Sequence, residues 1–345
     1  MTLLQFFGFC KYCLTLFGVF ITSIAAFGGE REVTVLNSKD SIELAGTLLI
    51  PDNCPAKGVL IMATGSGQQN RDEEILGHKP FRTIAEFLAA KGYASLRLDD
   101  RGVGGSKGDF AVSSTPDFVD DIEAAIAFTN NELPGVPVGI LGHSQGGLVG
   151  IITAAANPEC KFLVTIGAPA WQGDSIIMSQ ARAMSKKLTG KWDGESKQRR
   201  YLDVVKAEIP SSQTKTALKI MLMSDLGEMA KMPGVEAQID RQIEGMLSPD
   251  YRWLMRYNPA QDIKTVTVPW LAIKGELDLQ VLPENLETIK QLNPTACTLL
   301  LKGHNHLLQR CKTGLPMEYA QINEDISQEA LQAIADWLDD NCKSF

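Results

Sequence analysis

The sequence of 345 residues has no excess of basic residues, since 33 Lys and Arg stand against 41 Asp and Glu and give a formal net charge of −8. A protein that binds nucleic acid carries a basic stripe that neutralises phosphates, so we expect no nucleic-acid partner. Low-complexity tracts and internal repeats are also absent, which excludes disordered, collagen-like and solenoid proteins. The apolar fraction of 44% is typical of a globular protein with a sizeable core.

Long apolar runs are lacking after residue 29, so nothing later in the sequence is suited to span a bilayer. Residues 1–29 are apolar with one charge at Lys11, and residues 13–26 have the length of a signal-peptide core. Small residues near the end of that run fit a small-x-small cleavage rule. We predict a signal peptide at residues 1–29 and an exported, periplasmic protein. The deep position of Lys11 leaves open an uncleaved N-terminal membrane anchor.

Cysteines are few and fit export only loosely. Two of the seven, Cys10 and Cys13, lie in the predicted signal peptide, and the remaining five are an odd number, so at least one thiol stays free or pairs between chains. Their spacings match no metal-binding motif, and we expect no metal. The sequence leaves open a Cys311–Cys342 disulfide, which spacing alone does not establish.

Hydrophobic periodicity predicts an α/β fold. Residues 32–37 and 41–50 alternate between polar and apolar, which predicts an antiparallel hairpin. Strands then alternate with helices, which predicts a mostly parallel sheet. The other predicted strands are residues 58–63, 93–98, 136–141, 162–166, 268–274 and 295–301, and the predicted helices are residues 81–91, 116–130, 146–156, 283–292 and 327–342.

The alternation is interrupted at residues 172–258, which contain helical stretches and no convincing strand. We therefore predict one α/β domain, formed by residues 30–171 and 259–345, with a helical insertion that lies as a lid over the carboxyl edge of the sheet. Eight of the eleven methionines belong to this segment. Because Met adapts to irregular apolar surroundings, they either line a pocket for an apolar substrate or fill the core of the lid itself.

The pentapeptide Gly142-His143-Ser144-Gln145-Gly146 fits the G-x-S-x-G pattern. A predicted strand precedes it and a predicted helix follows it, which is the context of a nucleophile on a sharp strand-to-helix turn. Such a turn holds the serine in a strained conformation and needs small neighbours for clearance. At this motif the chain resembles the α/β-hydrolase family, which implies that an acid follows a late strand and a histidine follows the last strand.

The resemblance selects the other two members of a catalytic triad. The family commonly shows Gly-x-Asn-His after the last strand, and the stretch 303–306 matches this pattern with His306 as the base, with His304 as the alternative. The family pattern Gly-x-x-Asp-x-x-Val matches residues 275–281, with Asp278 as the acid and Glu276 as the alternative. The resemblance thus implies the order Ser144, Asp278, His306, in which the acid holds the tautomer of the histidine.

The resemblance also implies an oxyanion hole made of backbone N–H groups. One donor is expected at Gln145 and the second at Ser66, with Gly65 as the alternative. The loop 64–73 lacks the Lys of a phosphate-binding P-loop, so we do not interpret it as a nucleotide site. The glycine-rich stretch 99–106 is expected to be a structural turn in which Arg101 pairs with a nearby acid.

Further stretches, at residues 65–73, 77–81 and 100–104, resemble a bacterial branch similar to serine aminopeptidases and monoglyceride lipases. Members of that branch are mostly assigned as carboxylesterases. The resemblance therefore implies a serine carboxylesterase that hydrolyses a small or medium acyl ester through an acyl-enzyme, without a cofactor. A peptidase or an acyl thioesterase with the same triad is the alternative, and a non-catalytic binding protein is a further one, against which the complete triad argues.

Overall fold

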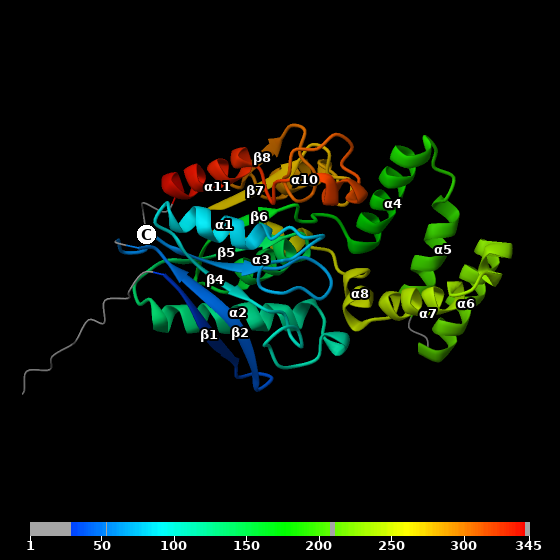
Figure 1. The fold of residues 1–345 in the computed structure, drawn as a ribbon, viewed down its shortest axis with the longest axis horizontal. Coiled ribbons are helices and arrows are strands. Elements are labelled where there is room, and N and C mark those ends of the chain that lie inside the picture. The colour runs from blue at the N-terminus through cyan, green and yellow to red at the C-terminus, as the bar shows by residue number, and fades with distance from the viewer. Residues whose placement is uncertain (1–28, 53, 208–210, 342–345) are drawn as a thin grey trace, which may run out of the picture.

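The computed structural model describes residues 29–341 except residues 53 and 208–210, and eight strands form one sheet within it (Figure 1). The strands are β1 (Gly29–Asn37), β2 (Ile42–Ile50), β3 (Val59–Ala63), β4 (Ala94–Leu98), β5 (Val138–His143), β6 (Cys160–Ile166), β7 (Trp270–Gly275) and β8 (Cys297–Leu301). Their order in the sheet is β1-β2-β4-β3-β5-β6-β7-β8. β2 pairs antiparallel with β1 and with β4, and all the other pairs are parallel. The predicted hairpin and the mostly parallel sheet are confirmed.

Helices cover both faces of the sheet, which is why its central strands are continuous apolar runs. In β3 the side chains alternate, so that Leu60 and Met62 enter one core while Val59 and Ile61 enter the other. The first core is completed by α1 (Pro80–Ala89) and α11 (Gln328–Asn341), and the second by α2 (Thr115–Glu132), α3 (Gln145–Ala156), α9 (Ala260–Thr265) and α10 (Glu284–Leu292).

The sequence predicts these elements well, with ends shifted by a few residues at most. It misses α9 and the short 3₁₀ helices η1 (Phe110–Val112) and η3 (Pro316–Gln321). Elements of three to six residues contain too few turns to show a hydrophobic period, so nothing in the sequence pattern distinguishes them from loops.

The segment between β6 and α9 contains helices and no strand among its described residues, and in Figure 1 it projects beyond the end of the sheet. A separate apolar core holds it together, including Leu202, Val205, Leu218 and Ile243. The division of the chain into a domain and a lid at residues 172–258 stays a prediction. The helices of the segment are α4 (Gly173–Thr189), α5 (Glu195–Lys206), α6 (Ser211–Leu226), η2 (Gly227–Lys231), α7 (Val235–Met246) and α8 (Pro249–Leu254).

Most methionines of this segment serve its own core. Met229 and Met232 are exposed on its surface, with exposed fractions of 57% and 59%. Of the two interpretations left open by the sequence, internal packing thus accounts for most of these methionines, and Met255 also lines the cavity beside Ser144 described below. The methionines that belong to this core or pack against it are Met178, Met221, Met223, Met246 and Met255.

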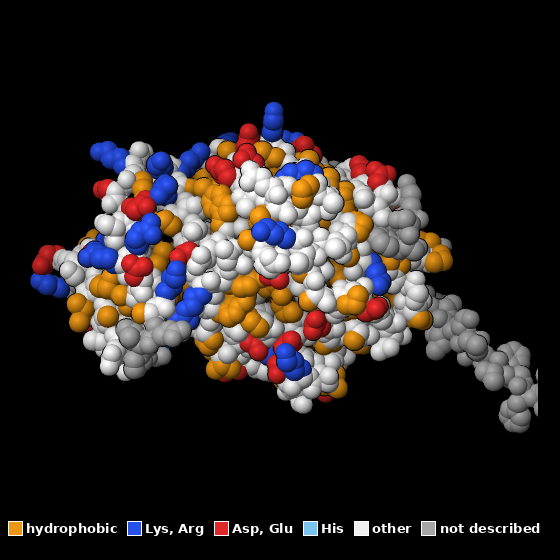
Figure 2. Space-filling model, turned by 180° about the vertical axis from the view of Figure 1, so that it is seen from behind, with side chains coloured by type: hydrophobic (Ala, Val, Ile, Leu, Met, Phe, Trp, Pro, Cys, Tyr) orange, Lys and Arg blue, Asp and Glu red, His pale blue; other side chains and the backbone are white. Residues whose placement is uncertain are grey.

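Lys and Arg side chains gather over this helical segment in the view from behind (Figure 2). Lys186, Lys187, Lys191, Arg199 and Arg200 are all exposed, which is typical of a solvated face. None of the helices that the structure describes combines the length and the apolar character that crossing a membrane requires.

Several predictions fall on residues that the structure does not describe. The signal peptide at residues 1–29 lies outside the described range except for Gly29, which begins β1. Export and the alternative of an uncleaved anchor therefore stay predictions. Cys342 is outside the range too, so its bridge to Cys311 also stays a prediction. Among the described residues, Cys54, Cys160, Cys297 and Cys311 form no disulfide with one another.

Candidate functional site

Ser144 stands on the turn between β5 and α3, at the carboxyl edge of the sheet. Its backbone has φ 53° and ψ −116°, a conformation that costs a non-glycine residue free energy and is concentrated at functional sites. The turn is held by the Ser144 N–H, which donates to the Ile166 carbonyl at 2.8 Å. The side chain is half-buried, as a nucleophile that meets a substrate should be.

The glycines around Ser144 are required by close backbone approach. A Cβ at Gly142 would lie 2.2 Å from the Gly146 carbonyl oxygen, and a Cβ at Gly146 would lie 2.0 Å from the Ala63 carbonyl oxygen. Any side chain at either position would displace the turn or the end of β3. The expectation that small residues must flank the serine is thus explained by close contact within the turn at Gly142 and with the end of β3 at Gly146.

Asp278 and His306 form a buried pair in the loops after β7 and β8. Asp278 Oδ2 accepts a hydrogen bond from His306 Nδ1 at 2.7 Å. Asp278 Oδ1 accepts the N–H groups of Gln280 and Val281, each at 2.9 Å. Since the acid occupies Nδ1–H, the lone pair of the imidazole is left on Nε2, which is the arrangement of a general base.

Burial, the charges of the two partners and the nearby Lys274 shift the pKa values of Asp278 and His306. Burial alone would raise the pKa of Asp278, but the charges of His306 and Lys274 hold it below its usual value. Burial lowers the pKa of His306, and the Asp278 carboxylate offsets this only in part. Lys274 Nζ lies 3.6 Å from Asp278 Oδ2 and donates to the Val281 carbonyl at 3.0 Å. Sequence reasoning missed Lys274, whose only signal is a cation at the end of an apolar strand.

The alternatives for base and acid are engaged elsewhere. His304 places its two ring nitrogens 2.8 Å from the Lys302 carbonyl and from Ser327 Oγ. Glu276 accepts the Gly303 N–H at 3.1 Å. The geometry thus favours His306 and Asp278. No hydrogen bond joins Ser144 Oγ to His306 among the described residues, and such bonds often tighten only when substrate binds.

The loop after β3 presents Ser66, not Gly65, to the space above Ser144. The Gly65 N–H donates to Glu73 Oε1 at 2.6 Å and is therefore occupied. Ser66 lines the same cavity as Ser144 and Gln145. This favours Ser66 over Gly65 as the second oxyanion donor, and the donor roles of Ser66 and Gln145 stay predictions.

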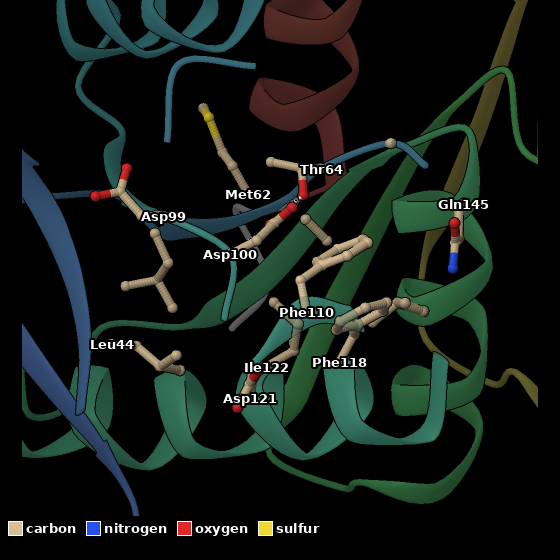
Figure 3. A pocket seen from close by; sticks show the side chains of 14 residues that line it. Leu44, Met62, Thr64, Asp99, Asp100, Phe110, Phe118, Asp121, Ile122 and Gln145 are labelled. Atoms are coloured by element: carbon tan, nitrogen blue, oxygen red, sulfur yellow. Dashed lines mark hydrogen bonds between the residues drawn. The ribbon is translucent and has the colours of Figure 1, made fainter. Parts of the chain in front are cut away.

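Asp100 fixes both ends of this loop. Its carboxylate accepts Thr64 Oγ1–H at 2.6 Å and the Gln69 N–H at 2.8 Å, and burial raises its pKa to about 7. Figure 3 shows Asp100 beside Thr64 at a cavity of about 50 Å³, walled by the stacked rings of Phe110 and Phe118. Ser144 does not line this cavity, so it is not the place of a reaction at the serine.

The glycine-rich turn at residues 99–106 is structural, as predicted. Arg101 Nε and Nη2 donate to the two carboxylate oxygens of Asp121 at 2.6 and 3.0 Å. A further ion pair joins Arg101 to Asp40 at 2.6 Å. These bonds tie the turn after β4 to α2 and to the hairpin.

A second cavity, of about 120 Å³, contains the Ser144 side chain. Its walls are mostly apolar and come from the sheet domain and from the helical segment, with Leu148 and Val281 on one side and Ile176, Ile177 and Leu254 on the other. The described residues include no group of three or more His, Cys, Asp or Glu placed to hold a metal ion.

A buried network connects the helical segment to the nucleophile turn. Gln145 Nε2 donates to Asp250 Oδ2 at 2.8 Å and to Thr115 Oγ1 at 2.9 Å. Thr115 Oγ1 in turn donates to Asp250 Oδ1 at 2.8 Å. Asp250 belongs to α8, so the first residue of α3 is held by the segment that also walls the cavity. Sequence reasoning did not identify this contact, because it joins residues 105 positions apart.

Comparisons with known proteins agree with this fold. The chain is 23% identical over 317 residues to Esterase EstD of Thermotoga maritima, covering 90% of this chain and 67% of EstD. It is 32% identical to human monoglyceride lipase over 104 residues, covering 30% of this chain and 31% of the lipase. The structure of the Pyrococcus furiosus esterase PF2001 superimposes with a TM-score of 0.58 at 16% identity, covering 91% of this chain and 92% of that chain.

Residues 78–299 match the family described as serine aminopeptidase, S33. The match runs from before β4 into β8 and includes Ser144 and Asp278. The resemblance inferred from the sequence motifs and the predicted α/β-hydrolase fold are both confirmed. Because this match covers more than half of the chain, the chain belongs to the serine aminopeptidase S33 family of α/β-hydrolases.

Proposed function

We propose that the protein is a serine carboxylesterase that hydrolyses small or medium acyl esters through an acyl-enzyme. The observation that carries the proposal is the strained Ser144 at an apolar cavity, at the same sheet edge as the buried His306–Asp278 pair. Family membership and the likeness to EstD support ester hydrolysis in general.

The reaction follows from the hydrogen bonds of the pair. Ser144 Oγ forms a bond to the ester carbonyl carbon while its proton passes to His306 Nε2, and the imidazolium is stabilised by Asp278. The N–H groups of Ser66 and Gln145 donate to the oxyanion. The ester C–O bond then breaks, and Nε2–H protonates the departing alkoxide. Water attacks the acyl-enzyme with His306 again as base, and the carboxylic acid and Ser144 are released.

The helical segment acts in this proposal as the lid at residues 172–258. α4 and α8 supply one wall of the cavity, and the Gln145–Asp250 bond holds α8 to the nucleophile turn. An apolar cavity of about 120 Å³ is suited to an uncharged acyl group of limited length.

The cavity favours an ester over the substrate of an amine-reading peptidase. A peptidase that recognises a free amino group needs a carboxylate near the nucleophile, and no Asp or Glu is among the residues that line this cavity. An acyl thioesterase would use the same walls and remains the second candidate.

A series of p-nitrophenyl esters from acetate to laurate tests the proposed function. We expect kcat/KM to be highest for short or medium chains and to fall towards laurate as the chain outgrows the cavity. Absence of turnover on every ester would overturn the proposal and direct the search to thioesters and amides. Failure of a fluorophosphonate probe to label Ser144 would instead support a non-catalytic binding protein.

The pH dependence of kcat/KM should reflect the lowered pKa of His306. The base must be neutral in the free enzyme, and burial moves the pKa of His306 below its ordinary value of 6.5. Activity should therefore rise through a pKa below 6.5 and already be at its plateau at neutral pH. A pH profile of short-chain ester hydrolysis measures this, and an acid limb centred above 6.5 would contradict it.

A further inference from the structure

Glu73 is a buried carboxylate next to the site, and the mechanism above does not use it. Its exposed fraction is 1%, and Oε1 accepts both the Gly65 N–H at 2.6 Å and His143 Nδ1–H at 2.8 Å. Oε2 is buried and has no hydrogen-bond partner among the residues that the structure describes. A carboxylate in such a place is costly unless it is paired with a cation.

His143 can provide that cation. Its Nδ1 faces the Glu73 carboxylate, and its Nε2 lies 3.3 Å from the His306 carbonyl oxygen. A carbonyl oxygen only accepts hydrogen bonds, so Nε2 must carry a proton, and the carboxylate requires one on Nδ1. With Glu73 ionised, both contacts are satisfied together only by the doubly protonated imidazolium. Burial opposes this charge, but the Glu73 carboxylate outweighs it and raises the pKa of His143.

The surroundings of His143 contain charges of both signs. Glu73 and Asp278 favour its charged form. The ring of His306 packs against the ring of His143, with centroids 4.6 Å apart. The Lys274 ammonium lies 3.6 Å from the Asp278 carboxylate. A cation at His143 also disfavours protonation of His306, which agrees with the lowered pKa of that base.

We propose that Glu73 and His143 form a buried ion pair that positions the oxyanion loop against the backbone of His306. Glu73 holds the loop through the N–H of Gly65, the residue before the expected donor Ser66. His143 holds the His306 backbone through the carbonyl. The two residues are positioning residues, and their effect on turnover rests on the esterase function proposed above.

Glu73→Gln tests the pair, because it keeps the shape and removes the charge. We expect kcat on short-chain esters to fall about 100-fold, the scale of a misplaced oxyanion donor, with KM changed less than about twofold, since the acyl cavity is untouched. Glu74→Gln is the matched control, because Glu74 is exposed and its hydrogen bonds and ion pair within the described part of the chain are with Asn70 and Lys79; its kcat should be unchanged. Wild-type kcat in Glu73→Gln would overturn the positioning role.

Nitrogen-15 NMR of the wild-type protein tests the charge independently of turnover. With His143→Asn used for assignment, both ring nitrogens of His143 should be protonated at pH 7.5, and in Glu73→Gln the ring should become neutral. A neutral His143 in the wild type would overturn the ion pair even if esters are hydrolysed. Conversely, a charged His143 in a protein that hydrolyses no ester would refute the esterase and leave the ion pair standing.

Discussion

Ser144→Ala is expected to remove ester hydrolysis, with kcat reduced by at least about 10⁴-fold. The substitution deletes only the hydroxyl that forms the bond to the carbonyl carbon. Alanine has a Cβ as serine does, so the strained backbone at φ 53° is no harder to form and the fold should be retained. Purified wild-type and variant proteins are compared on the ester that the wild type hydrolyses fastest, and thermal unfolding verifies the fold.

Ser66→Ala is the matched control for this result. It makes the same chemical change on a side chain at the same cavity, but the expected role of Ser66 uses its backbone N–H, which alanine keeps. We expect kcat within about threefold of the wild type, since no hydrogen bond in the mechanism is lost. Turnover that survives in Ser144→Ala would show that Ser144 is not the nucleophile. Turnover that disappears equally in Ser66→Ala would contradict a role of Ser66 through its backbone alone and would leave the loss not specific to Ser144.

Asp278→Asn should lower kcat by about 10³- to 10⁴-fold, with little change in KM. The carboxylate oxygen that accepts His306 Nδ1–H would be replaced by an amide whose N–H group favours the opposite tautomer of the imidazole. In that tautomer Nε2 carries the proton and cannot take one from Ser144. The Lys274 ammonium, 3.6 Å from the carboxylate, would also lose its counterion. Steady-state kinetics across pH measure the effect.

Glu276→Gln separates Asp278 from the alternative acid. Glu276 lies two residues before Asp278 in the same loop. Its carboxylate accepts the Gly303 N–H, and the oxygen of a glutamine side chain can accept the same hydrogen bond. We expect kcat to stay within about twofold of the wild type. A large loss of kcat in Glu276→Gln, with kcat near the wild-type value in Asp278→Asn, would make Glu276 the acid of the triad. Equal losses of kcat in both variants would indicate that either substitution disrupts the loop, and would leave Asp278 without a specific role.

The sequence predicts the sheet and the nucleophile turn because both depend on local patterns. The alternation in β1 and β2, the apolar runs of β3 to β7, and the glycines on either side of Ser144 are features of short stretches. Asp278 and His306 could be located because the family fixes their order along the chain, and each follows a strand that the pattern already shows. The structure adds the hydrogen bond at 2.7 Å that joins them.

The methionine-rich segment shows where local information ends. Its composition is equally consistent with a substrate pocket and with a small core, because Met suits both surroundings. In the structure Met178 and Met246 belong to or pack against the core of the segment, whereas Met255 both belongs to that core and lines the cavity at Ser144. Helical periodicity predicts that helices are present but not which faces meet, and that choice decides which side chains reach the cavity.

The sequence by itself determines the α/β architecture and the position of Ser144 on a strand-to-helix turn, and the family that it resembles predicts Asp278 and His306 as acid and base. The tertiary structure alone decides which buried charges surround them: Lys274 beside the acid, Glu73 against His143 and Asp250 against Gln145. His143 and Glu73 are 70 residues apart, and Gln145 and Asp250 are 105 apart. No local propensity links such residues. They meet because the carboxyl ends of parallel strands lie at one edge of the sheet, so the loops that follow them are close together. A charge buried at that edge is stable only when a residue of a neighbouring segment pairs with it.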